Sequence, residues 1–145
     1  MTKKFFVYGS LMEGYFNYDK YLKGKVISRE YARTKGELYH LSNCGYPAMI
    51  EGEEYVYGEL LEVVDYEKSI EVLDVLENFY GEGNPINEYN RKIVSVEVLC
   101  NKRKELAYAY LYNTKSVEEL RANNPYIKDG NWTNFVNEQR LIKIW

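Results

Sequence analysis

Residues 91–112 read RKIVSVEVLCNKRKELAYAYLY. Apolar and polar side chains alternate over 91–99, with Ile93 as an exception, and a second strand-like run follows at 106–112. Alternation with a period of two is typical of a strand that buries one face, and the residues between the two runs, 101–105, are polar or charged. This stretch therefore predicts a β-hairpin.

The segment before the hairpin, residues 66–79, is predicted to form a helix. Its apolar residues fall mainly on one side of a helical wheel, in a stripe that includes Val75. Asp65 is placed to cap the start of this helix, and the glycines at 81 and 83 are expected to stop it.

Glu77 differs from the other carboxylates of this helix, because it falls between the apolar side chains of Leu73 and Ile70 on the wheel. Apolar surroundings disfavour the charged form of a carboxyl group and raise its pKa toward the range useful for proton transfer. The wheel leaves two interpretations open, a proton-transfer group or a boundary glutamate whose tip reaches solvent. Three other polar residues face solvent on the wheel: Glu71, Asp74 and Asn78.

The rest of the chain is predicted to consist mainly of strands. A first strand at 4–8 ends in Gly9 and Ser10, and Gly58 interrupts a later strand, which indicates a bulge or a close backbone approach. Further strands are expected at 26–27, 33–41, 48–50 and 55–63, with a hairpin turn at 52–54, and short helices within 12–22 and at 117–123 and 133–140. Runs of strands around one central helix predict an α+β fold built on a curled sheet.

Composition narrows the class of protein. The 145 residues suit one domain spanning 1–145, and the net charge of −3 without a basic stripe argues against nucleic acid or an anionic membrane as partner. Residues 1–4 precede only four apolar residues, so neither a signal peptide nor a membrane span is expected, and a cytoplasmic location follows. Cys44, Cys100 and His40 form no metal-binding spacing.

Two features bear on a binding site. The turn at Tyr8, Gly9, Ser10 and Leu11 follows a strand, and consecutive N–H groups in such a turn can hold a carboxylate or an oxyanion. Ser10 lacks the GxSxG context of a serine hydrolase. The chain also has 16 tyrosines, which either line a polar pocket or coat a sheet surface.

Several blocks of sequence form a series: residues 6–11 (FVYGSL), 36–39 (GELY), 45–48 (GYPA), 56–60 (VYGEL), 73–77 (LDVLE), 89–91 (YNR) and 109–110 (AY). In this order they resemble the γ-glutamylcyclotransferase-like family. That family includes γ-glutamylamine cyclotransferases, plant avirulence-induced (AIG2-like) proteins and the butirosin-pathway cyclotransferase. The resemblance covers roughly residues 4–112.

The resemblance implies a small mixed β-barrel with helices packed on the outside. It also implies a metal-free and cofactor-free enzyme that releases 5-oxoproline and an amine or amino acid from a γ-glutamyl compound. The substrate's own α-amine would attack the γ-carbonyl, with Glu77 as general acid and base. The residues that the resemblance assigns to substrate binding are Tyr8, Gly9, Ser10, Leu11 and, as a pocket hydroxyl, Tyr110.

Other hypotheses remain at this point. The same fold could serve as a non-catalytic module that binds a small zwitterion or a peptide end, or Glu77 could activate water in a metal-free hydrolase. Residues 78–88 form a longer loop than in compact family members, and this loop bears on substrate specificity. The amine half of the substrate and the oligomeric state stay open.

Overall fold

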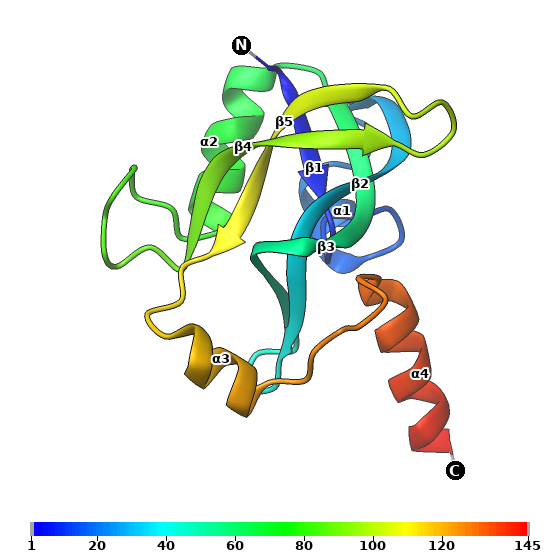
Figure 1. Ribbon diagram of the computed structural model, residues 1–145. Helices are drawn as coiled ribbons and strands as arrows, with labels where there is room; N and C mark the ends of the chain where they lie inside the picture. Colours follow the sequence, from blue (N-terminus) through cyan, green and yellow to red (C-terminus); the bar gives the residue numbers. More distant parts are fainter. Residues whose placement is uncertain (1, 145) are drawn as a thin grey trace.

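In the computed structural model, which describes residues 2–144, five strands close into a barrel in the order β1-β3-β2-β4-β5 (Figure 1). β1 runs parallel to β5, and the other neighbouring strands are antiparallel. The strands are β1 Lys4–Val7, β2 Val26–Leu41, β3 Tyr46–Val63, β4 Tyr89–Val98 and β5 Lys104–Tyr112. The predicted mixed barrel and the hairpin of residues 91–112 are confirmed.

Four helices lie outside the barrel among the described residues: α1 Phe16–Tyr21, α2 Tyr66–Leu76, α3 Val117–Asn123 and α4 Trp132–Ile144. Figure 1 shows α2 against the barrel wall, α3 and α4 beyond one end of the barrel, and α4 pointing away from it. Leu73 anchors α2 in the core at 1% exposure, and Trp132 anchors the start of α4. Within residues 2–144, no helix is both long enough and apolar enough to cross a membrane.

β1 forms the centre of the core. Phe5 and Phe6 are each 1% exposed, and β1 pairs with β3 on one side and with β5 on the other. A Cβ atom on Gly58 of β3 would lie 2.1 Å from the carbonyl oxygen of Val7. The close backbone approach predicted at Gly58 is therefore confirmed, because any larger residue there would push β3 away from β1.

Two predictions about the long strands were wrong. Residues 26–41 form one continuous strand, and residues 52–54 do not form a hairpin turn but continue β3. Glu37 pairs with Ile50 and Lys35 pairs with Tyr55, so four residues of β3 face Gly36 alone. The glycine and charged residues that indicate a turn instead form an irregularity in a strand, which the pairing with β2 holds in place.

The helix that was predicted over 66–79 ends earlier, at Leu76. Asn78 adopts a left-handed conformation with φ of 51°, and the N–H of Phe79 donates to the carbonyl of Asp74 at 2.9 Å. This pattern closes a helix, and asparagine is the usual alternative to glycine in it. The expected stops at residues 81 and 83 lie beyond the true end. Asp65 also makes no side-chain cap, because its own backbone is left-handed.

The helical wheel predicted correctly only in part which side chains of residues 66–79 are exposed. Glu71 and Asn78 are exposed as expected, but Val75 is 76% exposed although it falls in the apolar stripe. Asp74 was expected on the solvent side and is instead partly buried, because it accepts a hydrogen bond from Tyr110 and pairs with Arg91. The difference at Asp74 arises because its partners Arg91 and Tyr110 lie on β4 and β5.

Candidate active site

A cavity of about 280 Å³, called the first cavity below, lies where β1 ends, between α1, the end of α2 and the strands β4 and β5. All six residues singled out from the sequence line it: Tyr8, Gly9, Ser10, Leu11, Glu77 and Tyr110. They come from three segments that are far apart in the chain. Closure of the barrel brings these segments together, because β1 pairs with β5 and α2 packs beside both.

The turn after β1 is held by its own backbone and by α1. The N–H of Met12 donates to the carbonyl of Gly9, and the N–H of Tyr18 donates to the carbonyl of Ser10, both at 3.0 Å. The side-chain amide of Asn17 donates to the Ser10 hydroxyl at 2.7 Å. The loop therefore has a defined shape without a bound ligand.

The N–H groups of Ser10 and Leu11 have no acceptor among the described residues. Backbone N–H groups away from solvent are normally paired, so a pair of free donors at a cavity wall can serve an incoming anion. A Cβ atom on Gly9 would lie 2.5 Å from Cγ of Pro47, which explains why the chain needs glycine at this turn. The turn can thus present two donors to a carboxylate or an oxyanion.

Glu77 occupies the position just after α2. Its backbone N–H donates to the carbonyl of Leu73 at 2.9 Å, and its carbonyl accepts from the N–H of Tyr89 at 3.3 Å. Among the described residues no group donates a hydrogen bond to the Glu77 carboxylate. Every fully buried polar side-chain atom in residues 2–144 has a partner. The Glu77 carboxylate oxygens have none, so they are not fully buried, and they are open to the cavity that Glu77 lines.

Burial, followed by the charge of Glu88, raises the pKa of Glu77 from its ordinary value of 4.5 to about 7. The C-terminal end of α2 adds partial negative charge at the same place, which also disfavours the ionised carboxylate. A group with a pKa near neutrality can both accept and return a proton under physiological conditions. This position is therefore suited to acid–base chemistry.

The tyrosines of the cavity are tied into the surrounding structure. The Tyr8 hydroxyl donates to the carbonyl of Tyr110 at 2.5 Å, and the Tyr110 hydroxyl donates to Asp74 at 2.6 Å. Arg91 completes this chain by pairing with Asp74. Burial raises the pKa of both tyrosine hydroxyls, so both stay protonated. A role for Tyr110 as a hydroxyl that binds substrate remains a prediction, since that hydroxyl already has an acceptor.

Sequence reasoning assigned no role to several other residues that line the cavity, among them Asn17, Pro47, Glu88 and Tyr89. Tyr89 donates to the carbonyl of Pro47 at 2.8 Å, and both residues lie in blocks that resemble the family, which was a usable signal. Glu88 accepts from the side chain of Asn78 at 3.0 Å and so ties the two ends of the 78–88 loop together. Asn17 had no signal in the sequence, because it enters the site through α1.

The charge of the cavity is one-sided. Glu77 and Glu88 line it, and its described lining contains no lysine, arginine or histidine. The lining therefore combines acidic groups with a turn whose backbone N–H groups at Ser10 and Leu11 are unpaired among the described residues. This arrangement suits the α-amino and α-carboxylate groups of an amino-acid-like ligand.

Residues 5–134 match the model of a protein family described as "Gamma-glutamyl cyclotransferase, AIG2-like". The chain is 33% identical over 116 residues to the gamma-L-glutamyl-butirosin B gamma-glutamyl cyclotransferase of Niallia circulans, covering 80% of this chain and 70% of that protein. It is 37% identical over 110 residues to a candidate gamma-glutamylcyclotransferase of Methanocaldococcus jannaschii, covering 74% of this chain and 82% of that protein.

Solved structures show the same fold. The mouse AIG2-like protein superposes with a TM-score of 0.67 at 23% identity, over 86% of this chain and 85% of that one. YkqA of Bacillus subtilis superposes with a TM-score of 0.64 at 26% identity over 100% of this chain, which spans 44% of the YkqA chain. From the family match and the identity to these relatives, the chain belongs to the family of AIG2-like gamma-glutamyl cyclotransferases.

Proposed function

We propose that this member of the family releases 5-oxoproline from a γ-glutamyl compound and that Glu77 moves the proton. The observation that carries the proposal is a carboxyl group with a pKa of about 7 and no protein donor, in the same small cavity as the free N–H groups of Ser10 and Leu11. The relative from Niallia circulans bears a name that specifies a γ-glutamyl group on butirosin B, which agrees with such a substrate.

In the proposed reaction the substrate's α-ammonium group faces Glu77 and its α-carboxylate lies on the turn of residues 8–11. Ionised Glu77 takes a proton from the ammonium group, and the resulting amine attacks the γ-carbonyl carbon. A C–N bond forms and closes a five-membered ring, and the bond between the γ-carbon and the leaving nitrogen breaks. Glu77 returns this proton to the leaving nitrogen, then takes the second proton from the ring nitrogen and passes it to the departing amine. The products are 5-oxoproline and the amine as its ammonium form, Glu77 is ionised again, and no water is consumed.

Positioning accounts for much of the expected rate. The attacking and attacked groups belong to one molecule, so holding the glutamyl chain folded is equivalent to a high local concentration of the nucleophile. The backbone N–H groups at the turn are held before substrate arrives, because α1 and Met12 fix the loop. Donors fixed in this way stabilise negative charge that develops on a nearby oxygen without further reorganisation.

The test is mass spectrometry of products from a panel of γ-glutamyl dipeptides and γ-glutamylamines. The wild-type protein is expected to form 5-oxoproline and Glu77→Gln to form far less of it. Glu71→Gln is expected to act like the wild type, because Glu71 lies on the exposed face of the same helix. Free glutamate in place of 5-oxoproline would indicate hydrolysis, and equal turnover by Glu77→Gln would remove Glu77 from the mechanism.

A further inference from the structure

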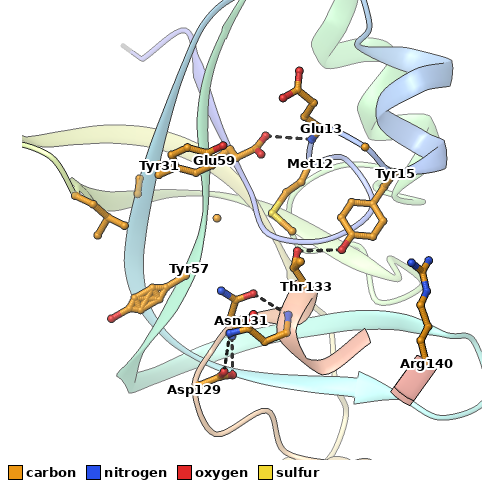
Figure 2. A pocket seen from close by; sticks show the side chains of 15 residues that line it. Met12, Glu13, Tyr15, Tyr31, Tyr57, Glu59, Asp129, Asn131, Thr133 and Arg140 are labelled. Carbon is orange, nitrogen blue, oxygen red and sulfur yellow. Dashed lines mark hydrogen bonds between the residues drawn. The ribbon is translucent and has the colours of Figure 1, made fainter. Parts of the chain in front are cut away.

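A second cavity, of about 720 Å³, lies next to the continuation of the same loop, and Figure 2 shows its lining. Residues 12–15 form one wall, β2 and β3 contribute residues 31–32 and 57–59, and residues 129–134 close the far side. No residue lines both this second cavity and the first. Its volume falls in the range of small-molecule sites, about 300–1,000 Å³.

Glu59 of β3 is the buried polar residue of this lining, with its side chain 7% exposed. Its Oε1 accepts hydrogen bonds from the N–H of Glu13 and from Nε of Arg29, both at 3.2 Å. Its Oε2 accepts no hydrogen bond from the described residues. Every fully buried polar side-chain atom in those residues has a partner, so Oε2 is not fully buried and is open to the cavity that Glu59 lines. One oxygen of a buried carboxylate is therefore available to a donor that enters.

The charges around Glu59 leave an excess of negative charge. Arg29 is shared, since its Nη1 also pairs with Oε2 of Glu13 at 3.2 Å, so one guanidinium serves two carboxylates. Burial raises the pKa of Glu59, and Arg29 limits that rise. Arg140 is exposed at the rim, where solvent screens its charge. A second cation near Oε2 would stabilise the ionised form of Glu59.

The other acidic group of the far wall is already engaged. Asp129 accepts from the N–H of Asn131 and from the side-chain amide of Asn134, each at 3.1 Å, as Figure 2 shows. Tyr31 and Tyr57 line the wall beside Glu59. The faces of tyrosine rings attract ammonium and guanidinium groups, and their edges pack well against a hydrocarbon chain.

Carboxylate oxygens that lie close together could also bind a metal ion. In the described part of the chain, however, the aspartate, glutamate, histidine and cysteine side chains nowhere gather in a group of three that could hold one. A single open carboxylate oxygen beside aromatic rings instead matches an organic cation with one or more N–H donors. A primary ammonium group on an alkyl chain has this chemistry.

We propose that the second cavity binds an organic primary ammonium compound, with its ammonium group on Oε2 of Glu59 and its carbon chain along Tyr31 and Tyr57. This site does not depend on the proposed reaction, because its residues and those of the first cavity are distinct.

The first test is an NMR titration of the wild-type protein with cadaverine, with pentanediol as a neutral chain of the same length and glutarate as an anionic one. Cadaverine is expected to shift the amide signals of residues 13–15 and 57–59 and to bind about tenfold or more tightly than pentanediol, because a charge-assisted hydrogen bond replaces a neutral one. Equal binding of the diol, tighter binding of glutarate, or no binding of cadaverine would overturn the proposal.

Variants locate the ligand. Glu59→Gln is expected to weaken cadaverine binding about tenfold, whereas Glu53→Gln, at an exposed position of the same strand, is expected to bind like the wild type. Tyr31→Ala gives a second test if Glu59→Gln does not fold, because Tyr31 is 65% exposed, and it should weaken binding several-fold. Loss of binding in Glu77→Gln with retention in Glu59→Gln would place cadaverine in the first cavity and overturn the proposal.

Discussion

Glu77 lines the first cavity and Glu59 lines the second, and the loop of residues 8–15 contributes to both. Burial raises the pKa of each carboxyl group. Their neighbours act in opposite directions, because Glu88 adds negative charge beside Glu77 whereas Arg29 adds positive charge beside Glu59. Burial alone therefore does not set the pKa of these two carboxyl groups, because the charges beside them contribute as well.

The two positions also differ in how they are built. Glu59 lies in the middle of β3, and its Oε1 has two donors that fix the side chain. Glu77 follows the last turn of α2, and its carboxylate has no donor among the described residues. The first arrangement suits a charge that stays in place, and the second suits a group that exchanges protons.

Glu77→Gln is expected to lower the rate of 5-oxoproline release by about 10²–10⁴-fold, the usual contribution of a general base. The glutamine keeps the shape of the side chain but cannot accept the proton of the α-ammonium group. Steady-state kinetics on the best γ-glutamyl substrate measures the effect, with Glu71→Gln as the matched control. A loss below tenfold would show that the substrate amine loses its proton elsewhere.

Arg29→Met is expected to lower the free energy of unfolding by about 3 kcal/mol, because Glu59 would remain buried without its counter-ion. The comparison variant is Lys35→Met on the same strand, whose pair with Glu53 is exposed on both sides, and it should cost no more than about 0.5 kcal/mol. Urea unfolding at neutral pH measures both. Equal costs would mean that the Glu59 carboxylate has no need of a counter-ion.

Stability should depend on pH in a way that Glu77→Gln removes. The folded-state pKa of about 7 lies above the ordinary 4.5, so the folded state holds this proton more tightly than the unfolded one. Wild-type stability should therefore fall as pH rises from about 4.5 to about 7, by up to about 3 kcal/mol, and level off above. The difference between Glu77→Gln and wild type, from urea unfolding across this window, isolates the contribution. A difference that does not change with pH would contradict the raised pKa.

Glu88→Gln is expected to have the smallest effect. Because the Glu88 charge raises the pKa of Glu77, its removal should move the midpoint of the pH–rate profile down. Glu82→Gln, in the same loop but outside the first cavity, provides the control. Added salt should shrink the shift, since Glu88 is exposed. An upward shift would reverse the assigned electrostatics.

The parts of the fold that depend on local pattern could be predicted from the sequence. The alternation over 91–99 placed the hairpin, and the strand followed by Gly9 and Ser10 placed the turn at the first cavity. Glu77 was singled out by the helical wheel and its role came from the resemblance to the family. The free N–H groups of Ser10 and Leu11 follow from the same turn chemistry.

The parts that depend on contacts between distant segments could not be predicted. Residues 52–54 have the composition of a turn, and only pairing with β2 opposite Gly36 keeps them in a strand. The end of α2 depends on Asn78 in a left-handed conformation, and the local pattern pointed instead to the later glycines. Glu59 occupies an ordinary position in the alternating pattern of a strand. Its burial and its pairing with Arg29 arise from the closure of the barrel.

The most direct test of the central claim is a ¹³C NMR titration of the glutamate carboxyl groups, with the Glu77 signal assigned by its loss in Glu77→Gln and with turnover measured in the same buffers. If Glu77 is the general base, its signal titrates near pH 7 and 5-oxoproline release rises with the same midpoint. A Glu77 signal that titrates near its ordinary value of 4.5, with turnover independent of that titration, would contradict that role.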